Sequence, residues 1–149
     1  MFTMSTLEVF AELEIAAEPT DVAGVMFDPA REPEWVEAVK TVEVIDPAIR
    51  PGARVKRVGR VKGFPIEWTT EVESFQFPHM LTLRVSQGPF AGTIKYLIGR
   101  SGTGSVARIA ISGEPAVPAF FPKELIAEKV NGALMGDLGR LKKLIETPA

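Results

Sequence analysis

Few residues of this 149-residue chain have the types and positions that chemistry requires. It contains no cysteine and a single histidine, His79, which excludes disulfides, thiolate nucleophiles and the usual structural zinc site. A Ser–His–Asp triad would have to use His79, which follows Phe77-Pro78 in a predicted turn and is interpreted as a surface residue. We therefore predict neither a metal site nor a bound cofactor.

Asp137 is the carboxylate whose position is most unusual. Between Ile126 and Ile145 apolar residues recur with helical spacing, and Asp137 falls inside that apolar stripe. A carboxylate there needs a partner or a wet cavity. It either holds a polar ligand group or acts as an acid or base in a cavity, or it reaches solvent or pairs with an arginine. Arg57 is a candidate partner, because it shares one strand face with Val55 and Gly59.

Two aromatic residues, Trp68 and Tyr96, occupy strand positions that alternation directs inward. Their N–H and O–H groups suit an apolar pocket with a few polar anchors, although plain core packing explains them nearly as well. The remaining candidate ligand-binding residues are apolar and lie on the helix face, in the short helices or near loops. They are Trp35, Met26, Phe27, Phe90, Phe120, Val130, Leu134 and Leu141.

The elements that must position these residues follow from hydrophobic periodicity and turn signals. Two short helices are predicted after Glu18-Pro19-Thr20-Asp21 and over Ala30–Val36, and a long helix from about Pro122 to Ile145. Strands are predicted over Leu7–Ile15, Val39–Ile45, Arg54–Val61, Ile66–Phe75, Leu81–Ser86, Thr93–Gly99 and Ser105–Ser112.

Composition bounds the class of protein. The length predicts one domain over residues 1–149, and a formal charge of −2 with a pI near 5.5 argues against nucleic acid as a partner. No stretch reaches the ~20 apolar residues of a membrane span, and the N-terminus does not resemble a signal peptide, so we expect a cytoplasmic protein. Gly132, Gly136 and Gly139 lie away from the apolar helix stripe, where they face either solvent or a second subunit of a homodimer.

Several segments together resemble the START-like, or birch-pollen-allergen-like (SRPBCC), superfamily. They are Ala17-Glu18-Pro19-Thr20-Asp21-Val22 after the first strand, Phe27-Asp28, Trp35 with Val39 and Val42, Pro51-Gly52-Ala53-Arg54, and the terminal helix. Within this superfamily the chain looks like the polyketide cyclase/dehydrase and lipid-transport branch. The resemblance implies an α+β helix-grip fold, in which a curved antiparallel sheet of six or seven strands wraps around the long helix, with a ligand cavity between the sheet and the helix.

Three functions agree with this resemblance. The first is binding or transport of a small hydrophobic or amphipathic ligand such as a lipid, quinone or polyketide, without stable membrane insertion. The second is an enzyme of the aromatase/cyclase or dehydratase type, for which only Asp137, Tyr96, Arg57 and Glu67 offer acid–base groups. The third is a regulator acting through its surface, indicated by the basic strand Arg54–Val61. We favour the first, because no catalytic motif is recognisable.

Overall fold

The computed structural model of the chain describes residues 7–88, 90–115 and 122–147. Within these residues, seven strands form one antiparallel sheet in the order β1-β7-β6-β5-β4-β3-β2. The elements in chain order are β1 (Leu7–Ile15), α1 (Pro19–Met26), the 3₁₀ helix η1 (Pro29–Glu34), β2 (Val39–Val44), β3 (Arg54–Val61), β4 (Phe64–Gln76), β5 (Met80–Gln87), β6 (Phe90–Ser101), β7 (Gly104–Pro115) and α2 (Lys123–Glu146).

Strand β1 shows how the sequence selects the buried face of the sheet. Its apolar residues at alternate positions, including Leu7, Val9 and Ala11, are buried, whereas the intervening glutamates are exposed. It pairs with β7 in unbroken register from Leu7 opposite Gly113 to Ile15 opposite Ser105. One face of β1 therefore points to the core along the length of the strand.

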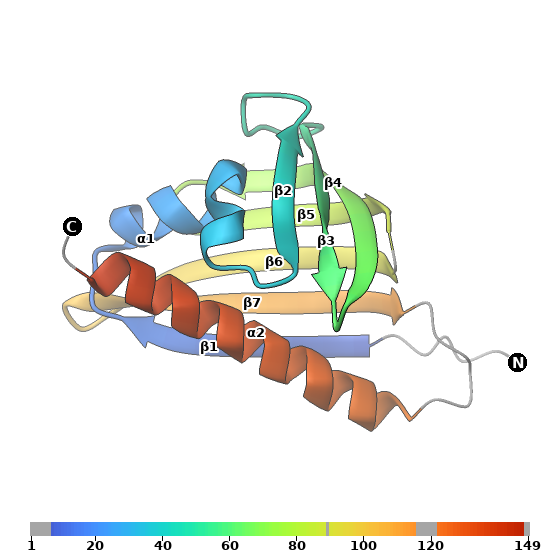
Figure 1. Cartoon of the computed structure of the whole chain (residues 1–149). Coiled ribbons are helices and arrows are strands. Elements are labelled where there is room, and N and C mark those ends of the chain that lie inside the picture. Colours follow the sequence, from blue (N-terminus) through green and yellow to red (C-terminus); the bar gives the residue numbers. More distant parts are fainter. Residues whose placement is uncertain (1–6, 89, 116–121, 148–149) are drawn as a thin grey trace, which may run out of the picture.

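The sheet is strongly bent. In Figure 1, β2, β3 and β4 run roughly perpendicular to β5, β6, β7 and β1. The register of β4 against β5 shifts twice, between Thr69 and Thr70 and between Val72 and Ser74. Such bulges bend a strand and increase its twist, so they place the curvature between the two halves of the sheet.

Helix α2 packs on the inner face next to β1 (Figure 1), and Leu134, Asp137, Leu138 and Leu141 are its buried residues. It begins and ends within one residue of the predicted limits, and the predicted α+β helix-grip fold is confirmed. Neither described helix is both long and apolar enough to cross a membrane.

The second short helix differs from the prediction. It is a 3₁₀ helix that begins at Pro29, where Asp28 Oδ1 accepts a hydrogen bond from the N–H of Ala30, and it ends before Trp35. Pro33 lacks the N–H that an α-helix would need at this position. Beyond it the chain passes close to β3: a Cβ on Gly59 would lie 1.6 Å from the carbonyl oxygen of Ala38. This close approach holds the segment after η1 against β3.

Candidate functional site

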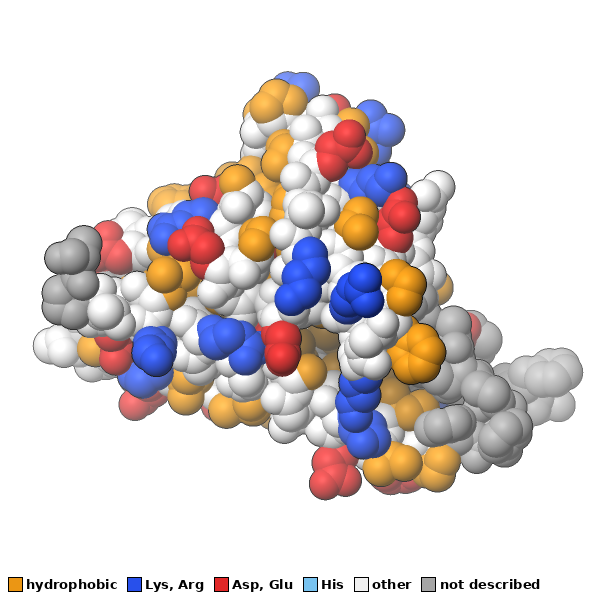
Figure 2. Space-filling model, in the orientation of Figure 1, with side chains coloured by type: hydrophobic (Ala, Val, Ile, Leu, Met, Phe, Trp, Pro, Cys, Tyr) orange, Lys and Arg blue, Asp and Glu red, His pale blue; other side chains and the backbone are white. Residues whose placement is uncertain are grey.

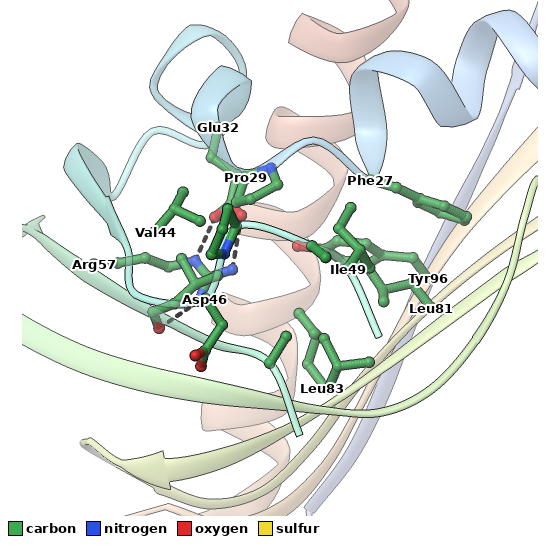
Figure 3. Close-up of a pocket in the computed structure, with 15 residues that line it drawn as sticks. Phe27, Pro29, Glu32, Val44, Asp46, Ile49, Arg57, Leu81, Leu83 and Tyr96 are labelled. Carbon is green, nitrogen blue, oxygen red and sulfur yellow. Dashed lines mark hydrogen bonds and ion pairs between the residues drawn. The ribbon is translucent and has the colours of Figure 1, made fainter. Parts of the chain in front are cut away.

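A small cavity lies between η1, the β2–β3 connection and the inner face of strands β3 to β6 (Figure 3). Its volume is about 30 Å³. Most of its surface is apolar. It is lined by Phe27, Pro29, Glu32, Val44, Asp46, Pro47, Ala48, Ile49, Ala53, Val55, Arg57, Val72, Leu81, Leu83 and Tyr96.

A buried ion pair between Arg57 of β3 and Glu32 of η1 forms the polar wall of this cavity. Their exposed fractions are 3% and 4%. Arg57 Nε donates to Glu32 Oε1 at 2.6 Å, and Nη2 donates to Oε2 at 2.8 Å, so the contact is bidentate. Arg57 Nη1 donates to Thr70 Oγ1 at 2.6 Å and to the carbonyl oxygen of Val55 at 3.4 Å. The pair thus ties η1 to two strands of the sheet.

Two consequences follow for the chemistry of Arg57. Burial alone would lower the pKa of Arg57, but the hydrogen bonds and charge of Glu32 outweigh it and raise the pKa, so the guanidinium stays charged. Of its five N–H donors, four make the hydrogen bonds given above. One N–H of Nη2 therefore remains without a partner among the described residues.

Tyr96 of β6 lies across the cavity from this pair (Figure 3). Burial raises the pKa of Tyr96 far above its ordinary value, the charges of Glu32 and Asp137 raise it further, and the charge of Arg57 opposes them. The hydroxyl therefore stays protonated at neutral pH and is able to donate a hydrogen bond.

An aromatic cluster fixes the position of Tyr96. Its ring stacks on Phe27 of the α1–η1 link, with centroids 6.3 Å apart, and contacts the tilted ring of Trp35 at 6.0 Å. Trp35 also lines a second, open hollow on the other side of η1, beside Arg140 of α2. Its Nε1 is the one buried side-chain polar atom among the described residues that has no hydrogen-bond partner.

Asp137 is buried, but it does not line the cavity. Its Oδ1 accepts hydrogen bonds from the N–H of Glu37, at 3.2 Å, and from Arg140 Nη2. Arg140 Nε in turn donates to the carbonyl oxygen of Trp35 at 3.0 Å. The predicted pairing of Asp137 with Arg57 is wrong, because Arg57 pairs with Glu32. Asp137 and Arg140 instead fasten α2 to the segment after η1.

Of the predicted ligand-binding residues, the structure brings Phe27, Arg57 and Tyr96 together around the cavity. Trp68 shares the inner face, opposite Arg57 in the β3–β4 ladder, but it is half-buried outside the cavity. Phe120 lies outside the described residues. Also away from the cavity are Met26, Leu134 and Leu141, which are buried in the core, and Val130 and Phe90, which are half-buried.

The sequence predicted a cavity beside the long helix, but the observed cavity has no lining residue from α2. The reason is that α2 packs directly on β1 and on the short helices. The sequence interpretation also missed Glu32, Val44 at the end of β2, and the part of the β2–β3 connection from Asp46 to Ile49. One signal could have identified Glu32. An arginine predicted to point inward requires an acid, and Glu32 is among the acids to which the sequence interpretation gave no role.

The fold is that of the helix-grip class, and comparisons with known proteins agree. The structure resembles a START superfamily protein from Mycobacterium smegmatis (TM-score 0.82, 17% identity, covering 93% of this chain and 97% of that one). It also resembles the protein TTHA0849 from Thermus thermophilus (TM-score 0.79, 20% identity, 93% and 96% covered). A third similar structure is Ara h 8.0201 (TM-score 0.72, 14% identity, 95% and 98% covered). At these identities the likeness shows the fold alone.

Sequence comparison gives the family. Residues 6–146 match the family described as "Polyketide cyclase / dehydrase and lipid transport", so the chain belongs to this family. A comparison with curated protein sequences gives no significant match. Family membership supports the binding of hydrophobic ligands in general.

Proposed function

We propose that this protein binds a small amphipathic molecule, with an apolar body and one oxygen-bearing polar group, in the cavity between η1 and the sheet. The polar group would accept hydrogen bonds from the Tyr96 hydroxyl and from the remaining N–H of Arg57. The apolar body would contact the side chains of Ile49, Leu81 and Leu83. Lipids, quinones and polyketide-like molecules all have this character.

The observation that carries this proposal is the buried Arg57–Glu32 ion pair in a mostly apolar cavity. Burying two charges is unfavourable, and well-packed apolar residues of similar size are often equally stabilising or more so. A bidentate pair with one spare donor, facing a protonated Tyr96, supplies what such a site needs to orient a ligand.

Binding is better supported than acid–base catalysis. Within the described residues, Glu32 is the one buried carboxylate that lines the cavity, and both of its oxygens accept hydrogen bonds from Arg57. A general base must be able to take a proton from the substrate. Neither Glu32 in this pair nor the protonated Tyr96 is placed to do so.

The test uses the Tyr96→Phe variant, which removes one hydroxyl and keeps the aromatic packing. We expect wild type to bind 8-anilinonaphthalene-1-sulfonate, with displacement by a fatty acid, a quinone or an aromatic polyketide. Tyr96→Phe should weaken binding by about tenfold, because the ligand loses one hydrogen bond to its polar or charged group. Thr82→Val is the matched control. Thr82 is also buried, but it lies on β5 between Leu81 and Leu83, which face the cavity, so the side chain of Thr82 points to the opposite face of the strand.

Native mass spectrometry of the purified protein provides an independent measurement, since a retained small molecule would appear as added mass. The proposal fails if wild type binds neither the probe nor any of the three competitor classes. It also fails if Tyr96→Phe and Thr82→Val bind the probe as wild type does.

A further inference from the structure

The tip of the β3–β4 hairpin exposes apolar side chains that nothing in the described structure covers. Val61 ends β3 and Phe64 begins β4, and they lie opposite one another across the two-residue turn Lys62-Gly63. Both turn residues have positive φ, 49° and 84°, as a tight hairpin turn requires. Phe64 is 75% exposed and Val61 45%, so a ring and a branched side chain protrude together from one tight turn.

Cations surround this apolar tip. Lys62 lies in the turn, Arg60 precedes it on β3, and Lys40 lies on the adjacent part of β2, where Gly59 contacts the chain between Ala38 and Lys40. Arg60 donates to the carbonyl oxygen of Gly63 at 3.3 Å. Among the described residues, none of the three cations forms an ion pair with a carboxylate, whereas Lys56, farther along β3, pairs with Glu67 at 2.7 Å.

The two features occupy one region of the surface. Figure 2 shows Lys and Arg side chains beside exposed hydrophobic side chains where the β3–β4 hairpin ends above α2. The whole chain carries a formal charge of −2, so this positive patch is a local property and not a consequence of overall charge.

We propose that the tip of the β3–β4 hairpin docks the protein on the surface of an anionic lipid membrane. Val61 and Phe64 would enter the boundary between headgroups and acyl chains, and Lys40, Arg60 and Lys62 would contact the anionic headgroups. Apolar insertion combined with basic residues is the usual basis of reversible membrane attachment.

The dimensions and charge of the tip favour a membrane over a second copy of the chain. Two apolar side chains fall well short of the ~1,000 Å² expected for a specific protein interface. In a twofold symmetric contact the same patch would meet itself, which would bring Lys62 and Arg60 of both copies together. A bilayer needs only a small apolar wedge and supplies the opposite charge.

Vesicle flotation in about 0.1 M NaCl tests the proposal with two lipid compositions, phosphatidylcholine alone and a 7:3 mixture of phosphatidylcholine and phosphatidylglycerol. Wild type should bind the anionic vesicles and bind neutral ones much more weakly. Phe64→Ala should reduce the anionic partition coefficient by about tenfold. Lys40→Gln and Lys62→Asn should each reduce it by about fivefold, and asparagine tolerates the positive φ of Lys62.

Phe10→Ala is the matched control for Phe64→Ala. Phe10 is also a well-exposed phenylalanine, at 60%, but it lies on β1 beneath the guanidinium of Arg108. Its removal should leave vesicle binding unchanged. A Phe64→Trp variant adds a direct readout, because its fluorescence should shift to the blue on anionic vesicles. Thermal unfolding of each variant verifies that the fold is intact.

Three outcomes would overturn the proposal. They are equal binding of wild type and Phe64→Ala to anionic vesicles, equal losses for Phe64→Ala and Phe10→Ala, and a change in oligomeric mass on Phe64→Ala without a change in vesicle binding. The vesicle assay requires no ligand in the cavity. Failure of membrane docking is therefore distinguishable from failure of the proposed ligand binding.

Discussion

Removal of one partner of the Arg57–Glu32 pair should be strongly destabilising. In Arg57→Met the Glu32 carboxylate stays buried and loses both of its charged donors, at 2.6 and 2.8 Å. Breaking a buried pair in this way costs about 3–5 kcal/mol. For a domain of about 150 residues each kcal/mol corresponds to roughly 2–4 °C in the melting temperature. We expect the melting temperature to fall by about 6–20 °C.

The double variant Arg57→Met/Glu32→Leu should recover most of this loss, because neither charge remains buried. Replacement of a buried pair by apolar residues is often neutral or stabilising by about 1–4 kcal/mol. The assay is urea unfolding followed by tryptophan fluorescence, since Trp35 is buried against Tyr96. The four proteins of the double-mutant cycle, with Glu32→Leu as the second single variant, give the coupling free energy.

The same double variant separates stability from function. If the pair orients a ligand, the stable double variant should bind the anionic probe at least tenfold more weakly than wild type. A loss below about 1 kcal/mol in Arg57→Met, or a double variant as unstable as the sum of the single ones, would refute the energetic argument. Unchanged probe binding by a folded double variant would refute the functional one.

Two further predictions concern α2. Burial raises the pKa of Asp137 although the N–H of Glu37 and the Arg140 guanidinium oppose it. A carboxyl with a higher pKa in the folded state contributes stability that is present below its unfolded pKa of about 4 and is lost as pH rises through the folded value. In urea titrations at several pH values, the free energy of unfolding of wild type relative to Asp137→Asn should therefore decrease as pH rises from about 3 to 7, and parallel profiles would contradict this. A Cβ added at Gly132 or Gly139 meets no atom within 4 Å, so each Gly→Ala substitution should stabilise the protein by up to about 1 kcal/mol. Loss of a dimer in size-exclusion chromatography with light scattering would instead indicate that a second subunit packs on these glycines.

Much of the fold could be predicted from the sequence because alternation is unambiguous where one sheet face is buried. The limits of β1 and β3 agree with the prediction to the residue. Strands β6 and β7 extend beyond it, through Gly92 and Gly113, because these two glycines lie opposite one another and allow their backbones to approach. Glycine usually ends a predicted strand. Only the contact between the two strands shows that Gly92 and Gly113 continue β6 and β7.

The site was less predictable. Arg57 and Tyr96 were identified, because their strands alternate regularly. Glu32 was not, because it lies in a proline-rich 3₁₀ helix without apolar periodicity. The partner of Asp137 could have been found from the sequence, since Arg140 is three residues farther along the same helix. The position of the cavity could not be predicted from the sequence, because it depends on how the β2–β3 connection folds over the sheet.

The cavity of about 30 Å³ is far smaller than the 300–1,000 Å³ of typical small-molecule pockets, so the proposed ligand requires one wall to move. The sheet and η1 are joined by the buried Arg57–Glu32 pair. The β2–β3 connection is held by backbone hydrogen bonds, by the contacts of Ile49, and by an exposed ion pair between Asp46 and Arg54 that contributes little. We therefore expect this connection to open at a lower free energy than the wall formed by η1. Its displacement would admit a ligand beside Arg57, and the measured affinity would include the free energy of opening.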